Sequence, residues 1–400
     1  NDIELFRLKK HDFIDKSELK CDNIWMIRSI YWDDKRNCVF MIDQRKLPQE
    51  TVKFKVTTAN EMFYAIKNMV IRGAPAIGCA AGFGMALSAI KYKHKNNNNI
   101  NDFINYMKDT KIMLDKARPT AVNLSWATSR IIDTLQYMIS NNKDNNLSVS
   151  KLINICLIES KEIYNEDINT NIKMANYGNT IIKNGYNIMH HCNTGSLACV
   201  SGGTALGVIF KSHFSNKNIF VYVNETRPRL QGMRLTSWEL NELKIKHNIV
   251  VDSCCAHLLS NNKIDIILVG ADRIALNGDT ANKIGTHNIA CIANTYNIPM
   301  YIVAPITTID NNCLNGNKIN IEIRNDNEIN VINNKLLSPN NAKCYNPAFD
   351  ITPNKYITGI ITDYGICYPP YKESLLNVIK LANNDKHFKR KCLLKKYLQI

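Results

Sequence analysis

The segment VGADRIALNGDTANKIGT, which runs from Val269 to Thr286, gives the first indication of the fold. It continues an apolar run that begins at Ile264, and such a short apolar run predicts a buried strand. An acid, Asp272, follows the run directly, and then come a turn-like Asn277-Gly278-Asp279 and Lys283. Polar and charged residues at the end of a buried strand are typical of parallel sheets, whose carboxyl ends face a ligand.

Similar apolar runs lie on both sides of this segment, and stretches with helical spacing separate them. The apolar runs cover 186–192, 218–224, 247–253, 263–270 and 298–305, and the helical stretches cover 203–211, 233–243 and 283–295. Strands that alternate with helices predict right-handed crossovers and a doubly wound parallel sheet.

The N-terminal part of the chain has a different pattern. Residues 1–60 contain short strand-like pieces, residues 59–164 have helical spacing, and a helical stretch at 150–183 links the two parts. We therefore expect an α/β protein with a small N-terminal domain of strands and helices (1–165) and a domain built on a parallel sheet (166–371). A basic C-terminal tail (372–400) follows them, and Asn-rich tracts are expected to form loops.

Composition limits the class of protein. The chain has 400 residues, of which 45% are hydrophobic and 21% charged, as in ordinary globular proteins. No run approaches the ~20 apolar residues of a membrane span, so we expect no membrane partner. The net charge of +15 comes from lysines spread along the chain rather than from one basic patch, which argues against nucleic acid as a partner. The 13 scattered cysteines lack the spacing of a disulfide framework or zinc site and indicate a cytoplasmic location, with the nucleus as the alternative.

Three predicted strand ends carry dense polar chemistry. Cys192 begins a Cys-Asn-Thr-Gly sequence after the first strand, Gln231 lies in a polar stretch after the second, and Asp272 follows a later one. Cys192 is either a reactive thiol or a small buried hydrophobe. Asp272 is either a proton donor with a raised pKa, a helix cap, or a partner of Arg273. The residue pattern leaves these alternatives open.

Cationic residues lie close to glycines and predicted helix starts. Arg72 precedes Gly73 and Ala74 at the start of a helical stretch, where backbone N–H groups favour an anion. Arg118, Arg227 and Lys283 add further donors suited to a phosphate. The residues therefore predict a pocket of the size of a sugar phosphate that contains a thiol and a carboxylic acid. We find no nucleotide-binding motif and no metal-ligand spacing, so we expect neither a cofactor nor a metal.

Several segments resemble the methylthioribose-1-phosphate isomerases of methionine salvage, a family grouped with the alpha, beta and delta subunits of translation initiation factor 2B. The resemblance covers residues 25–368 in order and is strongest in IRGAPAIG (71–78), RPTAVNLSWA (118–127), HCNTGSLACVSGGTALGVI (191–209), VNETRPRLQGMRLTSWEL (223–240), VGADRIALNGDTANKIGT (269–286), YNPAFDITP (345–353) and GIITDYGI (359–366).

The resemblance implies a Rossmann-like sheet domain, a homodimer formed by the C-terminal domains, and an aldose–ketose isomerase. It implies that Cys192 and Asp272 are catalytic. It also implies that the substrate is bound by Arg72, Gly73, Ala74, Arg118, Gln231, Asn282 and Lys283. Asp272 would protonate the ring oxygen of the sugar, and Cys192 would either remove a proton from C2 or stabilise a hydride that moves from C2 to C1.

The sequence departs from the family pattern at a few positions. Asn224 stands in place of the usual Asp, His287 in place of the usual Tyr, and the stretch 311–341 is rich in Asn. The tail from Lys372 is unlike the family, and we expect it to be dispensable for catalysis. Two alternative functions remain open at this point, a ribose-1,5-bisphosphate isomerase and a non-catalytic regulatory subunit like those of translation initiation factor 2B.

Overall fold

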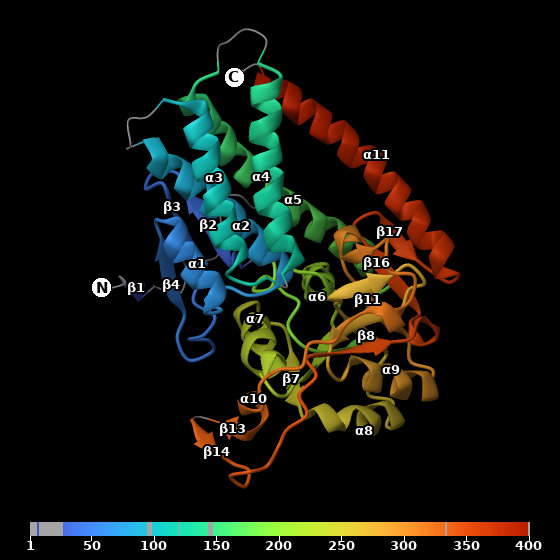
Figure 1. Ribbon diagram of the computed structural model, residues 1–400. Helices are drawn as coiled ribbons and strands as arrows, with labels where there is room; N and C mark the ends of the chain where they lie inside the picture. Colours follow the sequence, from blue (N-terminus) through green and yellow to red (C-terminus); the bar gives the residue numbers. More distant parts are fainter. Residues whose placement is uncertain are drawn as a thin grey trace.

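The computed structural model describes residues 6–7, 27–93, 98–119, 121–142, 147–332 and 334–398. Parts of two Asn-rich tracts, at 94–97 and 143–146, were expected to form loops and lie outside the described residues. Within the described chain, a helical N-terminal region (27–179) and a C-terminal region built on a large sheet (180–370) lie side by side (Figure 1).

The N-terminal region begins with an antiparallel sheet of order β1-β4-β3-β2 and continues with five helices. The strands are β1 (Phe6–Arg7), β2 (Ile30–Asp33), β3 (Cys38–Ile42) and β4 (Val52–Val56), and the helices are α1 (Ala59–Lys67), α2 (Ala74–Lys93), α3 (Ile100–Asp115), α4 (Val122–Ser140) and α5 (Val149–Asn179). This confirms the predicted change from short strands to helices. Thr58 and Glu61 form a capping box that fixes the start of α1.

Helix α2 is the centre of this region. Its apolar and small residues are buried almost all round, and it packs against α1, α3, α4 and α5. Of the described helices, α2 alone is long and apolar enough to cross a bilayer, but 78% of that apolar window is buried inside the protein. Its apolar character is thus accounted for by its place in the core.

The C-terminal region contains the predicted parallel sheet. Its order is β17-β16-β11-β8-β5-β6-β7, and all neighbouring pairs are parallel except β16 with β17 at one edge. The strands are β5 (Asn187–His190), β6 (Phe220–Asn224), β7 (His247–Val250), β8 (Ile266–Val269), β11 (Met300–Val303), β16 (Gly359–Thr362) and β17 (Gly365–Cys367). The five apolar runs that predicted strands are all strands of this sheet.

Helices cover this sheet as the crossover argument predicts. They are α6 (Ala205–Phe214), a π-helical turn (Gly232–Thr236) that continues into α7 (Ser237–Glu242), α8 (Cys255–Ser260) and α9 (Thr286–Thr295). The direction of the chain across the sheet changes between β5 and β8, because β6 and β7 lie on one side of β5 and the later strands on the other. Such a switch point leaves a crevice beyond the strand ends.

One expectation for this region was wrong. We predicted a helical stretch from Lys283, but Lys283 is the last residue of strand β10 (Thr280–Lys283), and the helix begins only at Thr286. Strand β10 pairs with β9 (Arg273–Ala275) and β15 (Phe349–Thr352), and β9 pairs with β12 (Ile309–Asp310). This second small sheet extends the β8 strand end and places Lys283 beside it.

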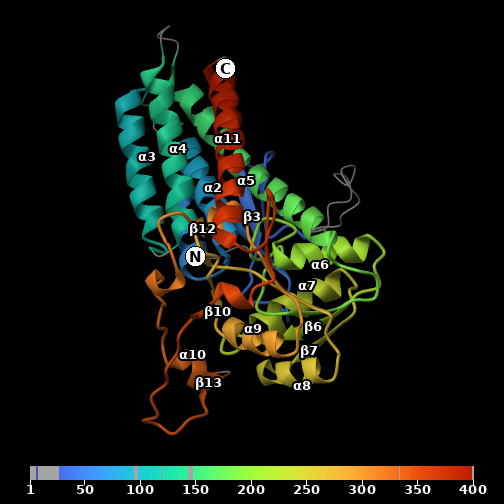
Figure 2. The same cartoon turned by 90° about the vertical axis from the view of Figure 1, so that its right-hand side faces the viewer.

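The Asn-rich stretch 311–341 contains little regular structure. It holds the short helix α10 (Asn327–Asn330) and a two-stranded hairpin, β13 (Val331–Ile332) with β14 (Lys335–Leu336), which project from the rest of the molecule (Figures 1 and 2). Arg227 anchors this stretch, because its guanidinium donates to the carbonyl of Ile329 at 2.8 Å.

The segment set apart as a tail forms helix α11 (Tyr371–Leu398), which runs from β17 back to the N-terminal region (Figures 1 and 2). Its first turns are anchored on the large sheet, where Leu375 is buried and the Tyr371 hydroxyl donates to the carbonyl of Ile357 at 2.7 Å. Its last turns contact α4 and α5, so one helix contacts both regions of the chain.

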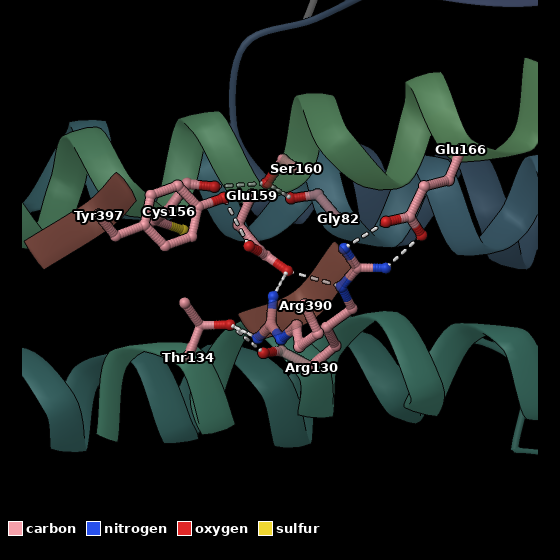
Figure 3. A network of polar contacts seen from close by, with 9 residues as sticks. All are labelled: Gly82, Arg130, Thr134, Cys156, Glu159, Ser160, Glu166, Arg390 and Tyr397. Atoms are coloured by element: carbon pink, nitrogen blue, oxygen red, sulfur yellow. Dashed lines mark hydrogen bonds and ion pairs between the residues drawn. The ribbon is translucent and has the colours of Figure 1, made fainter. Parts of the chain in front are cut away.

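A buried carboxylate holds the far end of α11. Glu159 on α5 is fully buried and accepts hydrogen bonds from Arg130 Nε at 2.6 Å, Arg390 Nη1 at 2.5 Å and the Tyr397 hydroxyl at 2.7 Å. Figure 3 shows these side chains converging between α4, α5 and α11. Arg390 also donates to Thr134 on α4. Because an unpaired buried carboxylate is costly, Glu159 ties α11 to both helices.

Candidate active site

The two proposed catalytic residues follow neighbouring strands at the switch point of the sheet. Cys192 comes two residues after the end of β5, and Asp272 three residues after the end of β8. Strands β5 and β8 are paired in parallel, so their carboxyl ends lie side by side. Adjacent strands are about 4.8 Å apart, which brings together two residues that are far apart in the sequence.

The backbone of Cys192 is held in a strained conformation. Its φ is +70°, in the left-handed region that residues with a Cβ rarely adopt, at a cost of roughly 1–3 kcal/mol. Two threonines hold it there, Thr226 in the loop after β6 and Thr236 at the end of the π-helical turn. The Cys192 N–H donates to Thr226 Oγ1 at 2.9 Å, and Thr236 Oγ1 donates to the Cys192 carbonyl at 2.6 Å. Backbone strain of this kind is common at functional sites, where it fixes the direction of a side chain.

The surroundings of the Cys192 thiol disfavour its ionised form. Burial raises its pKa, and the positive charges of Lys283 and Arg72 oppose that shift without cancelling it. The side chain is 7% exposed. Only the thiolate could accept a proton from a substrate, and Lys283 and Arg72 are the charges that favour that form.

Asp272 keeps exposed surface although protein atoms surround it closely. Burial raises the pKa of its carboxyl, while Lys283 and Arg72 act to lower it. Exposed surface gives a ligand access, and the crowding by protein atoms accounts for the raised pKa. Asp272 is not paired with Arg273, because Arg273 Nη1 lies 3.7 Å from Asp310 Oδ2. Asp272 is not a helix cap either, because it directly precedes strand β9. The surroundings of Asp272 therefore favour the role of a proton donor.

Gly73 is required where α2 begins. Its φ is +92°, and a Cβ at this position would lie 2.2 Å from the carbonyl oxygen of Ala198. This close approach places the start of α2, with the exposed Ala74, against the loop that carries Cys192. Arg72 lies at the same junction and donates from Nη1 to Asn193 Oδ1 at 2.7 Å. The N–H groups at the start of a helix and a guanidinium together favour an anion.

Three other predicted substrate-binding residues are buried. Lys283 is buried, donates to the carbonyl of Ala348 at 2.9 Å and lies over the ring of Phe349. Asn282 is buried and donates to Thr286 Oγ1. Gln231 is buried, and its Oε1 has no hydrogen-bond partner among the described residues. That oxygen is free to accept from a ligand hydroxyl.

Arg118 lies among other cations. Burial lowers its pKa, and the charges of Arg324, Arg72 and Arg229 lower it further, while Glu322 opposes them. No described residue forms a hydrogen bond with its side chain. Several cations that lie together beside only a few acids repel one another, and an anion relieves that repulsion. The electrostatics therefore indicate a phosphate-binding site.

Sequence reasoning missed Arg324. It is a half-buried residue of the Asn-rich stretch, with Nε buried and without a hydrogen-bond partner among the described residues, although Glu322 lies 3.5 Å away. Its guanidinium lies over the ring of Phe349, which also contacts Lys283. Its charge acts on Asp272 and Lys283. Within the Asn-rich stretch, the segment INIEIR (319–324) keeps part of the family pattern, and it was the signal that could have pointed to Arg324.

Arg227, in contrast, does not join the cation cluster. Its guanidinium donates to the carbonyls of Pro228 and Ile329, so its role is to hold the Asn-rich stretch.

The two single-residue departures from the family pattern, at positions 287 and 224, are accommodated by their neighbours. His287 lies against the ring of Tyr356, and its N–H donates to Asp350. Asn224 is buried beside His191, with its Oδ1 unpartnered among the described residues.

The fold and the site define a two-part α/β protein with a thiol, an acid and a cation cluster at the switch point of a doubly wound sheet. The model of the initiation factor 2 subunit family matches residues 70–369, and the chain belongs to this family. The relatives that match this chain over most of its length include isomerases. The methylthioribose-1-phosphate isomerase of Caldanaerobacter subterraneus subsp. tengcongensis is 49% identical over 340 residues, which cover 85% of this chain and 96% of the relative.

Solved structures show the same fold. A crystal structure of 5-methylthioribose 1-phosphate isomerase from Pyrococcus horikoshii OT3 is 38% identical, covers 88% of this chain and 96% of its own, and superposes with a TM-score of 0.82. A structure described as the delta subunit of translation initiation factor eIF-2B from A. fulgidus is 36% identical, covers 88% and 99%, and has a TM-score of 0.80. These two scores are so similar that the fold does not separate enzyme from regulatory subunit.

Proposed function

We propose that this chain is an aldose–ketose isomerase that converts 5-methylthioribose 1-phosphate to 5-methylthioribulose 1-phosphate in methionine salvage. The observation that carries the proposal is the pair formed by Cys192 and Asp272 at adjacent strand ends, inside a cluster of cations. A non-catalytic subunit has no need for a strained thiol and an acid with a raised pKa at one point. The names of the relatives support the same activity.

The cation cluster is proposed to bind the phosphate, through Arg72, Arg118 and Lys283 together with the backbone of Gly73 and Ala74. Gln231 and Asn282 present amides to the sugar hydroxyls. A phosphate on the anomeric oxygen prevents ordinary opening to a free aldehyde. Asp272, whose carboxyl has its pKa raised by burial, gives a proton to the ring oxygen as the ring opens.

The hydrogen on C2 then moves to C1 by one of two routes. In the first route, the Cys192 thiol gives up its proton to solvent, and the thiolate, which Lys283 and Arg72 stabilise, removes the C2 hydrogen as a proton and returns it to C1. In the second, the hydrogen moves directly as a hydride while Cys192 stabilises the charge at C2. In both routes the Asp272 carboxylate left by ring opening takes the proton of the C2 hydroxyl, which becomes the ketone. Turnover in deuterated water separates the routes. Deuterium on C1 of the product means that Cys192 transfers a proton, whereas its absence agrees with the hydride route.

Conversion of purified substrate to the ketose is the direct test of the function. The protein is incubated with methylthioribose 1-phosphate and, in parallel, with ribose 1,5-bisphosphate, and the products are followed by NMR. We expect turnover of the first substrate without added metal or cofactor, and unchanged by EDTA. Preference for the bisphosphate identifies the alternative isomerase, and no turnover of either favours a regulatory subunit.

Replacement of Lys283 by Met is expected to change both binding and pH dependence. KM should rise about tenfold or more, equivalent to roughly 1.4 kcal/mol, because a phosphate contact is lost. Lys283 acts to lower the pKa of Asp272, so its removal raises that pKa further. Because Asp272 must be protonated to act, the fall of kcat/KM at alkaline pH should move to higher pH.

The pH profile of kcat/KM for both proteins is the measurement. Lys263→Met, an exposed lysine that precedes β8, is the matched control and should keep the wild-type profile. An alkaline limb that stays in place in Lys283→Met contradicts the assignment of Asp272 as the acid.

The remaining expectations are also part of this proposal. We propose that the protein acts in the cytoplasm as a homodimer formed through its C-terminal region, without a nucleic-acid partner. Light scattering of the purified protein tests the dimer.

A further inference from the structure

A fully buried carboxylate lies behind the proposed site. Glu239 on α7 has no exposed surface and accepts hydrogen bonds from Asn193 Nδ2 at 2.8 Å and from the Ser196 N–H at 2.7 Å. Burial raises its pKa to about 7, and these hydrogen bonds oppose that shift. No described cation forms an ion pair with it. Burial of a carboxylate costs free energy. The groups that donate hydrogen bonds to Glu239 are the groups that it can orient.

The partner that matters is the side-chain amide of Asn193. A guanidinium can only donate, so the amide oxygen faces Arg72, and its NH₂ faces Glu239 Oε1 at 2.8 Å and Thr236 Oγ1 at 3.2 Å. That oxygen receives Arg72 Nη1 at 2.7 Å, and Arg72 Nη2 lies 3.3 Å from the Asn193 carbonyl. Glu239, Asn193 and Arg72 thus form a chain of hydrogen bonds with a single direction, which ends at the guanidinium beside Cys192.

The glycine of the Cys-Asn-Thr-Gly sequence belongs to the same arrangement. A Cβ on Gly195 would lie 2.4 Å from Glu239 Oε2. Any other residue would push the carboxylate away from Asn193. The glycine is therefore needed so that α7 can bring Glu239 against the loop, a close approach that only glycine allows.

We infer that Glu239 is a positioning residue that fixes Arg72 for the phosphate of the substrate by setting the direction of the Asn193 amide. This inference rests on the proposed function for the identity of the substrate, but the arrangement of Arg72 can be tested without turnover. If Glu239 had only a structural role, a glutamine of the same shape would serve nearly as well, and the replacement would have little effect on binding.

Glu239→Gln is the informative variant. The partners of Glu239 are all donors: the Asn193 NH₂ and the backbone N–H groups of Ser196 and Leu197. The backbone donors cannot turn, so the NH₂ of a glutamine faces Asn193, whose amide then turns to present its own NH₂ to Arg72. We expect KM for methylthioribose 1-phosphate to rise about tenfold, with kcat within about threefold of wild type. Glu242→Gln, a half-buried residue on the same helix, is the matched control and should leave both parameters unchanged.

A double-mutant cycle with Arg72→Ala shows whether Glu239 acts through Arg72. If it does, Glu239→Gln has little further effect in the Arg72→Ala background, because the group that it orients is gone. An equal effect in both backgrounds overturns the inference, and so does an unchanged KM in the single variant. If Glu239→Gln fails to fold, Asn193→Ala breaks the same chain and should raise KM in the same way.

Calorimetric titration with inorganic phosphate separates this inference from the proposed function. Wild-type protein should bind phosphate, and Glu239→Gln should bind it about tenfold more weakly. Weakened phosphate binding without turnover of the sugar phosphate by wild type supports the role of Glu239 and rejects the proposed reaction. Equal phosphate binding by wild type and variant rejects the role of Glu239, whatever the reaction is.

Discussion

Replacement of either Cys192 or Asp272 is expected to lower kcat by about 100-fold or more, the scale for a positioned acid or base. Both residues lie at the ends of neighbouring strands, and the same two cations, Lys283 and Arg72, act on both. KM should change little, because the phosphate is bound by other side chains. Steady-state kinetics of Cys192→Ser and Asp272→Asn give the measurement.

The double variant tests whether the two residues work together. Its loss of kcat should be much smaller than the product of the two single losses, as for residues that serve one transition state. Cys199→Ser, a buried cysteine further along the same loop, and Asp310→Asn, on the neighbouring small sheet, are the controls and should keep near wild-type kcat. Near wild-type kcat in Asp272→Asn would show that its place at the strand end is structural.

A chain that ends at Tyr371 is expected to lose several kcal/mol of stability. The deletion removes Leu375, Val378 and Ile379, which are buried against the C-terminal region, and burial of each such side chain contributes about 1.5–3 kcal/mol. It also removes Arg390 and Tyr397 from the buried Glu159. Denaturant unfolding of the shortened and full-length chains is the measurement.

Point variants separate the two ends of α11. Arg390→Ala should cost about 1–3 kcal/mol, because a buried carboxylate loses a charged partner. Lys389→Ala, whose exposed ion pair with Asp385 is worth about 0–1 kcal/mol, is the matched control. An unfolding midpoint of Arg390→Ala equal to that of the control contradicts the role of Glu159. The kcat of the shortened chain, measured where it stays folded, tests the expectation that the tail is dispensable for catalysis.

The sheet could be predicted from the sequence because most of its strands are covered on both faces, although the edge strand β7 keeps exposed residues. Such strands are continuous apolar runs, and each of the five is followed or preceded by a stretch of helical spacing. Parallel pairing then places the residues after each strand at one edge, which was enough to bring Cys192 and Asp272 together. Strands β9 and β10 were not predicted, because they are short and one partner, β15, lies at residues 349–352.

The residues that support the site could not be predicted in the same way. Glu239 stands between Trp238 and Leu240 in a helical stretch, where an acid is usually a solvated surface residue. Only the tertiary structure shows that it is buried against Gly195. Arg324 lies in an Asn-rich stretch, and the short INIEIR segment that ends with it does not by itself show that its side chain reaches the site.

Helix α11 has a consequence for cooperativity. Two regions joined only by a linker can melt separately, whereas α11 is anchored on the large sheet through Tyr371 and on α5 through Glu159. Helix α11 keeps its place only while both regions are folded, so the unfolding of either region also removes the contacts that α11 makes with the other. Full-length protein should therefore show one calorimetric transition whose enthalpy equals the van't Hoff value, and loss of α11 should split it in two.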